Sequence, residues 1–221
     1  MDSLQRVTDE VVNCFACPRL VAWRELVAEE KRASFADWDY WGRPVPGFGD
    51  PHASLLVVGL APAAHGGNRT GRVFTGDRSG DWVFKALWKA GYANQPTSVS
   101  ADDGLSLQGA YIAAAVRCAP PANKPTPDER DRCLPYLERE LALLPDVRVI
   151  VVLGKFALDA LCQMLGVRPR PRFGHLVEHQ LGVGGPVVLC SFHPSQQNTF
   201  TGKLTEPMFD AVFARARELG A

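Results

Sequence analysis

The chain has 221 residues, 46% of them hydrophobic and 22% charged, and its formal net charge is zero. This is the composition of a globular chain long enough to bury a core. No run approaches the roughly 20 apolar residues that cross a bilayer, and the opening MDSLQRVTDE has neither the basic nor the apolar region of a signal peptide. We therefore expect a soluble, cytoplasmic monomer without a membrane partner, and the neutral charge gives no global attraction for nucleic acid.

The first 45 residues show no strand pattern and are expected to form helices and loop, as an N-terminal arm packed on the core. Four later runs are continuously apolar and rich in β-branched residues, as strands buried on both faces of a parallel sheet are. They cover 54–60, 110–116, 147–153 and 186–192.

Helical spacing of apolar residues falls between and after these runs, over 80–90, 126–144, 155–165 and 205–219. The second of these helices opens with Thr126, Pro127 and Glu129, which form a capping box with proline at the first helical position. Strands that alternate with helices predict one α/β domain over residues 1–221, a three-layer α/β/α sandwich around a central, mostly parallel four-stranded sheet.

Long polar loops follow three of the four predicted strands, over 59–80, 117–127 and 193–203. In an open parallel sheet, the loops beyond the carboxyl ends of the strands line the ligand crevice. The functional site is therefore predicted at this edge of the sheet.

Two of the six cysteines have apolar surroundings in the sequence. Cys162 lies on an apolar helix face and Cys190 lies inside an apolar strand, so both are expected to be small buried side chains. A reducing compartment argues against disulfides for all six.

The other four cysteines form two spaced pairs, Cys14 with Cys17 and Cys118 with Cys133. The C-x-x-C pair alone is compatible with a redox pair, half of a zinc site or half of an iron–sulfur site. No histidine accompanies either pair, which favours a four-cysteine site for zinc or a 4Fe–4S cluster over four unrelated thiols.

Several motifs resemble one known family in the same order along the chain. After the C-x-x-C pair come GLAPAAHG (59–66), GRVFTGD (71–77), VRCAPPANKPTP (116–127) and HPSQQN (193–198). Together they are similar to the family 5 uracil-DNA glycosylases, the iron–sulfur-containing B type, from Cys14 to the final helix. The resemblance implies that Cys14, Cys17, Cys118 and Cys133 bind a structural 4Fe–4S cluster, which would connect the N-terminal arm to the mouth of the active site.

Removing uracil from DNA requires the nucleotide to be flipped out of the duplex, stacked, and supplied with hydrogen-bond donors and water. His193 is the expected donor to the uracil anion, together with main-chain N–H groups around Gly59, Leu60 and Ala61. Phe74 would stack on the flipped base, although its default role is that of a core aromatic.

Residues around these positions have expected roles in contacts with the base and the duplex. Asn123 is a candidate base reader or water holder, and Ser195, Gln196 and Gln197 would press into the duplex. The loop that carries Arg168, Arg170 and Arg172 is expected to contact phosphates, or else is a solvated connection.

Two positions depart from related families. The first loop reads Gly59-Leu60-Ala61-Pro62, so no side chain there can orient water, and Asp77 is the nearest carboxylate for that role. Alternatively, Asp77 only caps the helix that begins near Ser79. Residues 113–115 are all alanine where related families place a uracil-reading asparagine, and a less polar pocket predicts a broad base range that includes hypoxanthine.

Two other classes of function remain open. A non-catalytic, metal-containing nucleic-acid-binding module would keep the four thiols without Asp77 and His193. A small iron–sulfur redox protein would need an electron partner, and the sequence has no flavin motif or second cluster signature.

Overall fold

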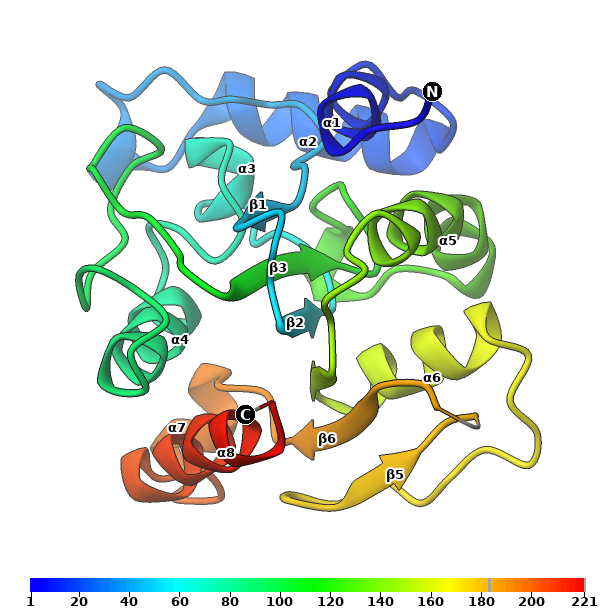
Figure 1. Ribbon diagram of the computed structural model, residues 1–221. Helices are drawn as coiled ribbons and strands as arrows, with labels where there is room; N and C mark the ends of the chain where they lie inside the picture. Colours follow the sequence, from blue (N-terminus) through cyan, green and yellow to red (C-terminus); the bar gives the residue numbers. More distant parts are fainter. Residues whose placement is uncertain (183, 221) are drawn as a thin grey trace.

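The computed structural model describes residues 1–182 and 184–220 (Figure 1). Its helices are α1 (Leu4–Val12), α2 (Pro18–Glu30), η1 (Ala33–Phe35), α3 (Gly67–Thr70), α4 (Arg78–Lys89), η2 (Pro121–Asn123), α5 (Pro127–Ala142), α6 (Lys155–Met164), α7 (Gln196–Phe200) and α8 (Glu206–Leu219). Its strands are β1 (Phe48–Gly49), β2 (Leu55–Gly59), β3 (Ala110–Ala114), β4 (Val149–Leu153), β5 (Glu178–Gln180) and β6 (Val187–Ser191). None of the described helices has the length and apolar character needed to span a bilayer.

The strands form one sheet in the order β1-β3-β2-β4-β6-β5. The four predicted runs are its parallel centre, in which Val57 of β2 pairs with Ile112 of β3 and Val151 of β4. The predicted number of four strands was too small, because β1 and β5 each add an antiparallel strand at an edge. β1 has only two residues and β5 reads Glu-His-Gln, so neither forms an apolar run that a sequence pattern can detect.

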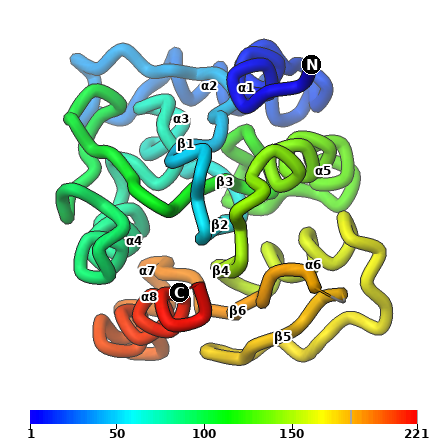
Figure 2. The backbone as a smooth tube through the Cα atoms, viewed as in Figure 1, coloured from blue at the N-terminus to red at the C-terminus, as the bar shows by residue number. Residues whose placement is uncertain are grey.

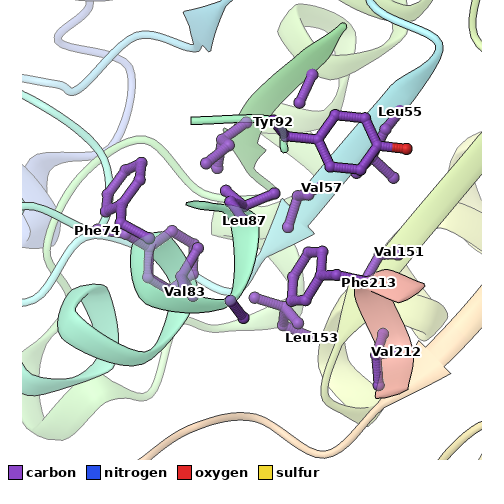
Figure 3. Close-up of a cluster of buried hydrophobic side chains, with 14 of the residues drawn as sticks. Leu55, Val57, Phe74, Val83, Leu87, Tyr92, Val151, Leu153, Val212 and Phe213 are labelled. Carbon is purple, nitrogen blue, oxygen red and sulfur yellow. The ribbon is translucent and has the colours of Figure 1, made fainter. Parts of the chain in front are cut away.

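Alternate residues of the central strands enter two cores on opposite faces of the sheet, as the predicted three-layer sandwich requires. On one face Val57 and Val151 pack with α4 and α8, and Figure 3 shows this cluster. On the other face Leu56 and Ile150 pack with α5 and α6. Cys162 and Cys190 are buried in the second core, as predicted.

The N-terminal arm contains α1, α2 and η1 and no strand, which confirms its prediction. Helix α1 packs on α5, where the Arg139 guanidinium binds the carboxylates of Asp2 and Glu10. At the start of α5, the Glu129 carboxylate accepts from Arg19 of α2 at 2.6 Å. The same carboxylate completes the predicted capping box by accepting from the Thr126 amide at 2.8 Å, a cap worth about 1 kcal/mol. The arm therefore rests on the helix that carries Cys133.

The tube view shows the chain after α2 passing over α3 before it reaches β1 (Figure 2). There Trp41 donates its main-chain N–H to the Arg69 carbonyl at 2.9 Å, and Gly42 donates to the Asn68 carbonyl at 3.0 Å. The end of the arm thus covers the loop that follows β2.

Candidate active site

The loops that follow β2 and β6 meet at the carboxyl edge of the sheet. Ser79, in the first turn of α4, donates its hydroxyl to the Pro194 carbonyl at 3.1 Å. This hydrogen bond joins the start of α4, which directly follows the GRVFTGD segment, to the HPSQQN segment, although 115 residues separate the two partners. The prediction that these motifs share one edge of the sheet is confirmed.

Phe74 and His193 face each other in this site. Their ring centroids are 6.1 Å apart and their planes are inclined by 35°. The Phe74 ring lies directly over Gly59, where an added Cβ would stand 2.7 Å from the ring. The main-chain carbonyl of Phe74 lies against Gly80 in the same way. Phe74 has φ = 52°, a left-handed conformation that costs a non-glycine residue on the order of 1 kcal/mol or more. Two glycines therefore leave room for Phe74, whose ring lies beside His193. Phe74 is also buried in the core, and Figure 3 shows it with the other side chains of this cluster.

His193 is a neutral imidazole at physiological pH. Burial lowers its pKa from 6.5 to about 4, because the charged form loses its hydration. Its ring nitrogens make no hydrogen bond within residues 1–182 and 184–220, while its carbonyl accepts from the Asn198 side chain at 2.8 Å. The ring can therefore offer one N–H donor to a bound group without introducing a positive charge.

Asp77 is the N-cap of α4, the second of the two roles that the sequence left open. It caps α4, since Oδ1 accepts from the Gly80 amide at 3.0 Å. Burial raises its pKa, which the Gly80 and Ser79 amides and the nearby Arg69 charge only partly offset. Oδ2 lies against Gly66, where an added Cβ would be 2.1 Å away. The capping alternative is therefore confirmed, and the catalytic role of Asp77 stays a prediction.

The first loop supplies main-chain donors and no polar side chain. The carbonyls of Gly59 and Leu60 accept from Ala115 and Val116 at 3.0 Å. The amides of Leu60 and Ala61, by contrast, donate to no acceptor in the part of the chain that the structure describes. Ala114, which pairs with Gly59 on the neighbouring strand β3, is also apolar, so this part of the site offers few polar side chains.

The predicted duplex-contacting residues lie on α7 and just before it. Ser195 caps this short helix by accepting from the Asn198 amide at 3.4 Å, while Gln196 and Gln197 are exposed. Asn123 is also exposed, has φ = 56°, and its side chain makes no hydrogen bond to the described residues.

The predicted phosphate-contacting arginines are exposed, but Arg170 is partly engaged within the protein. Its guanidinium lies 3.7 Å from the Asp159 carboxylate of α6. The Arg172 carbonyl is within hydrogen-bond distance of His179, at 2.9 Å. The same loop ends at His175, whose ring stacks on Phe192 with centroids 5.2 Å apart, next to His193.

Three of the four paired cysteines lie in one buried cluster. Cys17, Cys118 and Cys133 pack with Leu20 and Val116, and Cys14 is half-buried beside them. The pKa of the Cys118 thiol is raised to about 11, chiefly by burial and to a smaller extent by the Cys14 and Cys17 thiols, while the Arg24 charge opposes the rise. The two cysteine pairs, Cys14 with Cys17 and Cys118 with Cys133, thus lie close together. Among the described residues, however, no three His, Cys, Asp or Glu side chains are arranged so that they could hold a single metal ion.

Two N–H donors approach the sulfur atoms of this cysteine cluster. The Arg24 guanidinium, only 1% exposed, donates to Cys118 Sγ and to the Cys14 carbonyl at 3.1 Å each. The Arg117 amide donates to Cys133 Sγ at 3.4 Å. The Nε of Arg24 is buried without a partner among the described residues. A buried cation with an unused donor fits a negatively charged group at this position.

Sequence reasoning missed Arg69 and the role of Gly66. Arg69 is buried, donates to the His65 and Gly76 carbonyls at 2.8 Å each, and packs its guanidinium against two aromatic rings of the arm at 3.9 and 4.0 Å. It therefore fixes the turn that precedes Asp77. An arginine in a polar loop gives no sequence signal of burial, because its aromatic partners come from the arm.

The family model described as "Uracil DNA glycosylase superfamily" matches residues 46–217. The chain belongs to this superfamily. Among its relatives, the type-5 uracil-DNA glycosylase of Mycobacterium leprae is 52% identical over 220 residues, which cover 98% of this chain and 96% of that protein. The type-5 enzyme of Thermus thermophilus is 54% identical over 207 residues, which cover 93% of each chain.

Uracil-DNA glycosylases named type-4 are more distant. That of Sulfurisphaera tokodaii is 28% identical over 167 residues, which cover 75% of this chain and 61% of that protein. The predicted resemblance to family 5 of the uracil-DNA glycosylases is therefore confirmed.

Proposed function

We propose that this chain is a monofunctional DNA repair glycosylase, which hydrolyses the N-glycosidic bond of uracil in DNA and leaves an abasic site. Family membership supports the proposal. The observation that carries it is the placement of a desolvated carboxylate, Asp77, and a neutral imidazole, His193, on two loops joined by the Ser79–Pro194 hydrogen bond. A module that only binds nucleic acid has no use for this pair.

The flipped nucleotide would be held by the residues around the first loop. The Phe74 ring, which is 7% exposed and lies next to the His193 ring, supports the base by stacking. The unused amides of Leu60 and Ala61 donate to acceptors on the base. Asn123 is proposed to read the base or to hold water.

Bond cleavage separates charge that these residues stabilise. The electron pair of the C1′–N1 bond leaves with uracil, and the neutral N–H of His193 donates to the resulting anion. The Asp77 carboxylate stabilises the positive sugar and takes a proton from the water whose oxygen adds to C1′. Burial raises the pKa of Asp77 and makes its carboxylate a stronger base.

We propose that the base range extends to hypoxanthine, since few polar side chains in the pocket wall would be left unpaired by a different base. Labelled duplexes with uracil, hypoxanthine or only normal bases, treated with the enzyme and then with alkali, test this. Strand breaks at uracil and hypoxanthine alone are expected. Breaks at uracil only would limit the range, and no break at any base would favour the non-catalytic nucleic-acid-binding module.

We also propose that Cys14, Cys17, Cys118 and Cys133 hold a 4Fe–4S cluster. Each cysteine of such a cluster binds a different iron, whereas the four ligands of a zinc site all bind the same ion. The thiols of a cluster therefore stand farther apart. This is consistent with the described residues, among which no three metal-binding side chains are close enough together to hold one ion. Four thiolates make the group anionic, which suits the buried Arg24. The cluster would connect the arm to β3 and α5 and supply stability, not chemistry.

The cluster is tested by two single substitutions in the whole protein. Cys118→Ala should lose iron and the brown thiolate-to-iron absorbance and should melt at a lower temperature, because ligation energy is folding energy. Cys162→Ala, which removes a buried thiol of the distant second core, should keep its iron. A colourless wild-type protein that contains zinc would contradict the cluster.

A further inference from the structure

A large aromatic side chain stands in solvent at the rim of the site. Phe200, the last residue of α7, is 64% exposed. The guanidinium of Arg78, the first residue of α4, lies over its ring at 4.4 Å from the ring centre. Arg78 is itself exposed, so the pair presents an aromatic face and a positive charge to solvent side by side.

The Phe200–Arg78 pair is built on the two segments that carry the proposed chemistry. Arg78 directly follows Asp77, and Phe200 lies on the helix that begins after Ser195. Asn198 connects α7 to His193, since its side chain donates to the His193 carbonyl at 2.8 Å and its own carbonyl accepts from Leu204 at 3.0 Å. The backbone of the helix that carries Phe200 is therefore tied to His193.

An exposed aromatic ring next to a guanidinium has the chemistry of a nucleic-acid base-stacking site. Every base offers a π-face to an aromatic ring, and apolar side chains inserted between base steps unstack them and distort the duplex. The cation beside the ring neutralises a phosphate of the same strand. The fold gains little from this ring, because most of its surface remains in water.

We propose that Phe200 stacks on a DNA base that loses its neighbour when the target nucleotide is flipped out, and that Arg78 binds the adjoining phosphate. This inference rests on the proposed function. It extends the predicted duplex-contacting segment, Ser195 to Gln197, to the far end of α7, where an aromatic ring stabilises the opened duplex.

The test measures binding to a duplex that carries a stable abasic-site analogue with 2-aminopurine next to it. Phe200→Ala should weaken binding by about 5- to 150-fold, the range of one lost base–aromatic stack. The 2-aminopurine fluorescence, quenched by stacking in the wild-type complex, should be brighter with this variant. Phe200→Trp should restore both, and Arg78→Ala should reduce the slope of log Kd against log salt by about one.

Trp88→Ala is the matched control, since Trp88 is an exposed aromatic (47%) near the opposite end of α4 and should affect neither readout. Melting curves check that each variant is folded. If the wild type excises uracil but Phe200→Ala binds and quenches like wild type, this inference is wrong and the proposed function stands. If the wild type does not excise uracil, the proposed function itself fails.

Discussion

The buried imidazole of His193 should make the stability of the protein depend on pH in a defined way. The pKa of a free histidine is 6.5 and burial lowers that of His193 to about 4. Between these values the unfolded chain binds a proton that the folded chain does not. The contribution of His193 to the free energy of unfolding is therefore at its maximum above pH 6.5 and is lost as the pH falls toward 4.

The size of the effect follows from the two pKa values. At about 1.4 kcal/mol for each pH unit, the loss between pH 7.5 and pH 5.0 is up to about 2 kcal/mol. His193 is not completely buried, and solvent screening reduces this figure to between about 1 and 2 kcal/mol.

The comparison protein is His193→Gln, which keeps an N–H donor but cannot titrate. Urea unfolding of both proteins at pH 7.5 and pH 5.0 gives the free energy of unfolding at each pH. Groups such as His65, whose pKa burial also lowers, are common to both and cancel in the difference. The wild type should lose about 1–2 kcal/mol more than the variant. Equal losses would show that His193 titrates as an ordinary exposed histidine and would refute its role as a neutral donor.

Three further predictions concern the surroundings of the site. In Gly66→Ala the new Cβ would meet Asp77 Oδ2 at 2.1 Å and displace the carboxylate, so single-turnover excision should slow by about 10²-fold. An unchanged rate would show that the position of the Asp77 carboxylate is not needed for excision. Arg69→Gln removes a positive charge that lowers the pKa of Asp77, so the acidic limb of the pH–rate profile should move to higher pH, and an unmoved limb would contradict this. Glu140→Ala leaves the fully buried Arg117 unpaired and should lower the free energy of unfolding in urea by about 3–5 kcal/mol; a loss below about 1 kcal/mol would contradict the pairing.

The sheet centre and the main helices were predictable because their signals are local. Continuous apolar runs marked β2, β3, β4 and β6, and the Thr126 capping box marked the start of α5 to the residue. The edge strands β1 and β5 give no such signal, since their pairing depends on neighbours already in place.

The sequence predicted that the loops after β2 and β6 meet at one edge of the sheet, but it did not predict the residues that support these loops. Phe74 and His193 lie together as the loop positions indicated. The sequence could not decide between two roles for Asp77, because the hydrogen bond from the Gly80 amide that makes it a helix cap does not exclude a catalytic role. The packing of Arg69 on aromatic rings of the arm joins segments more than 30 residues apart, which no local pattern reveals.

The proposed mechanism depends most on Asp77, and Asp77→Asn tests this dependence directly. Asparagine keeps the side-chain oxygen that accepts from the Gly80 amide and caps helices as well as aspartate does, so the melting temperature and iron content should stay at wild-type values. Single-turnover excision of uracil from a labelled duplex should fall by about 10²–10⁴-fold, the contribution of a general base. A folded Asp77→Asn protein that excises uracil at close to the wild-type rate would show that Asp77 is only a helix cap and would contradict the proposed mechanism.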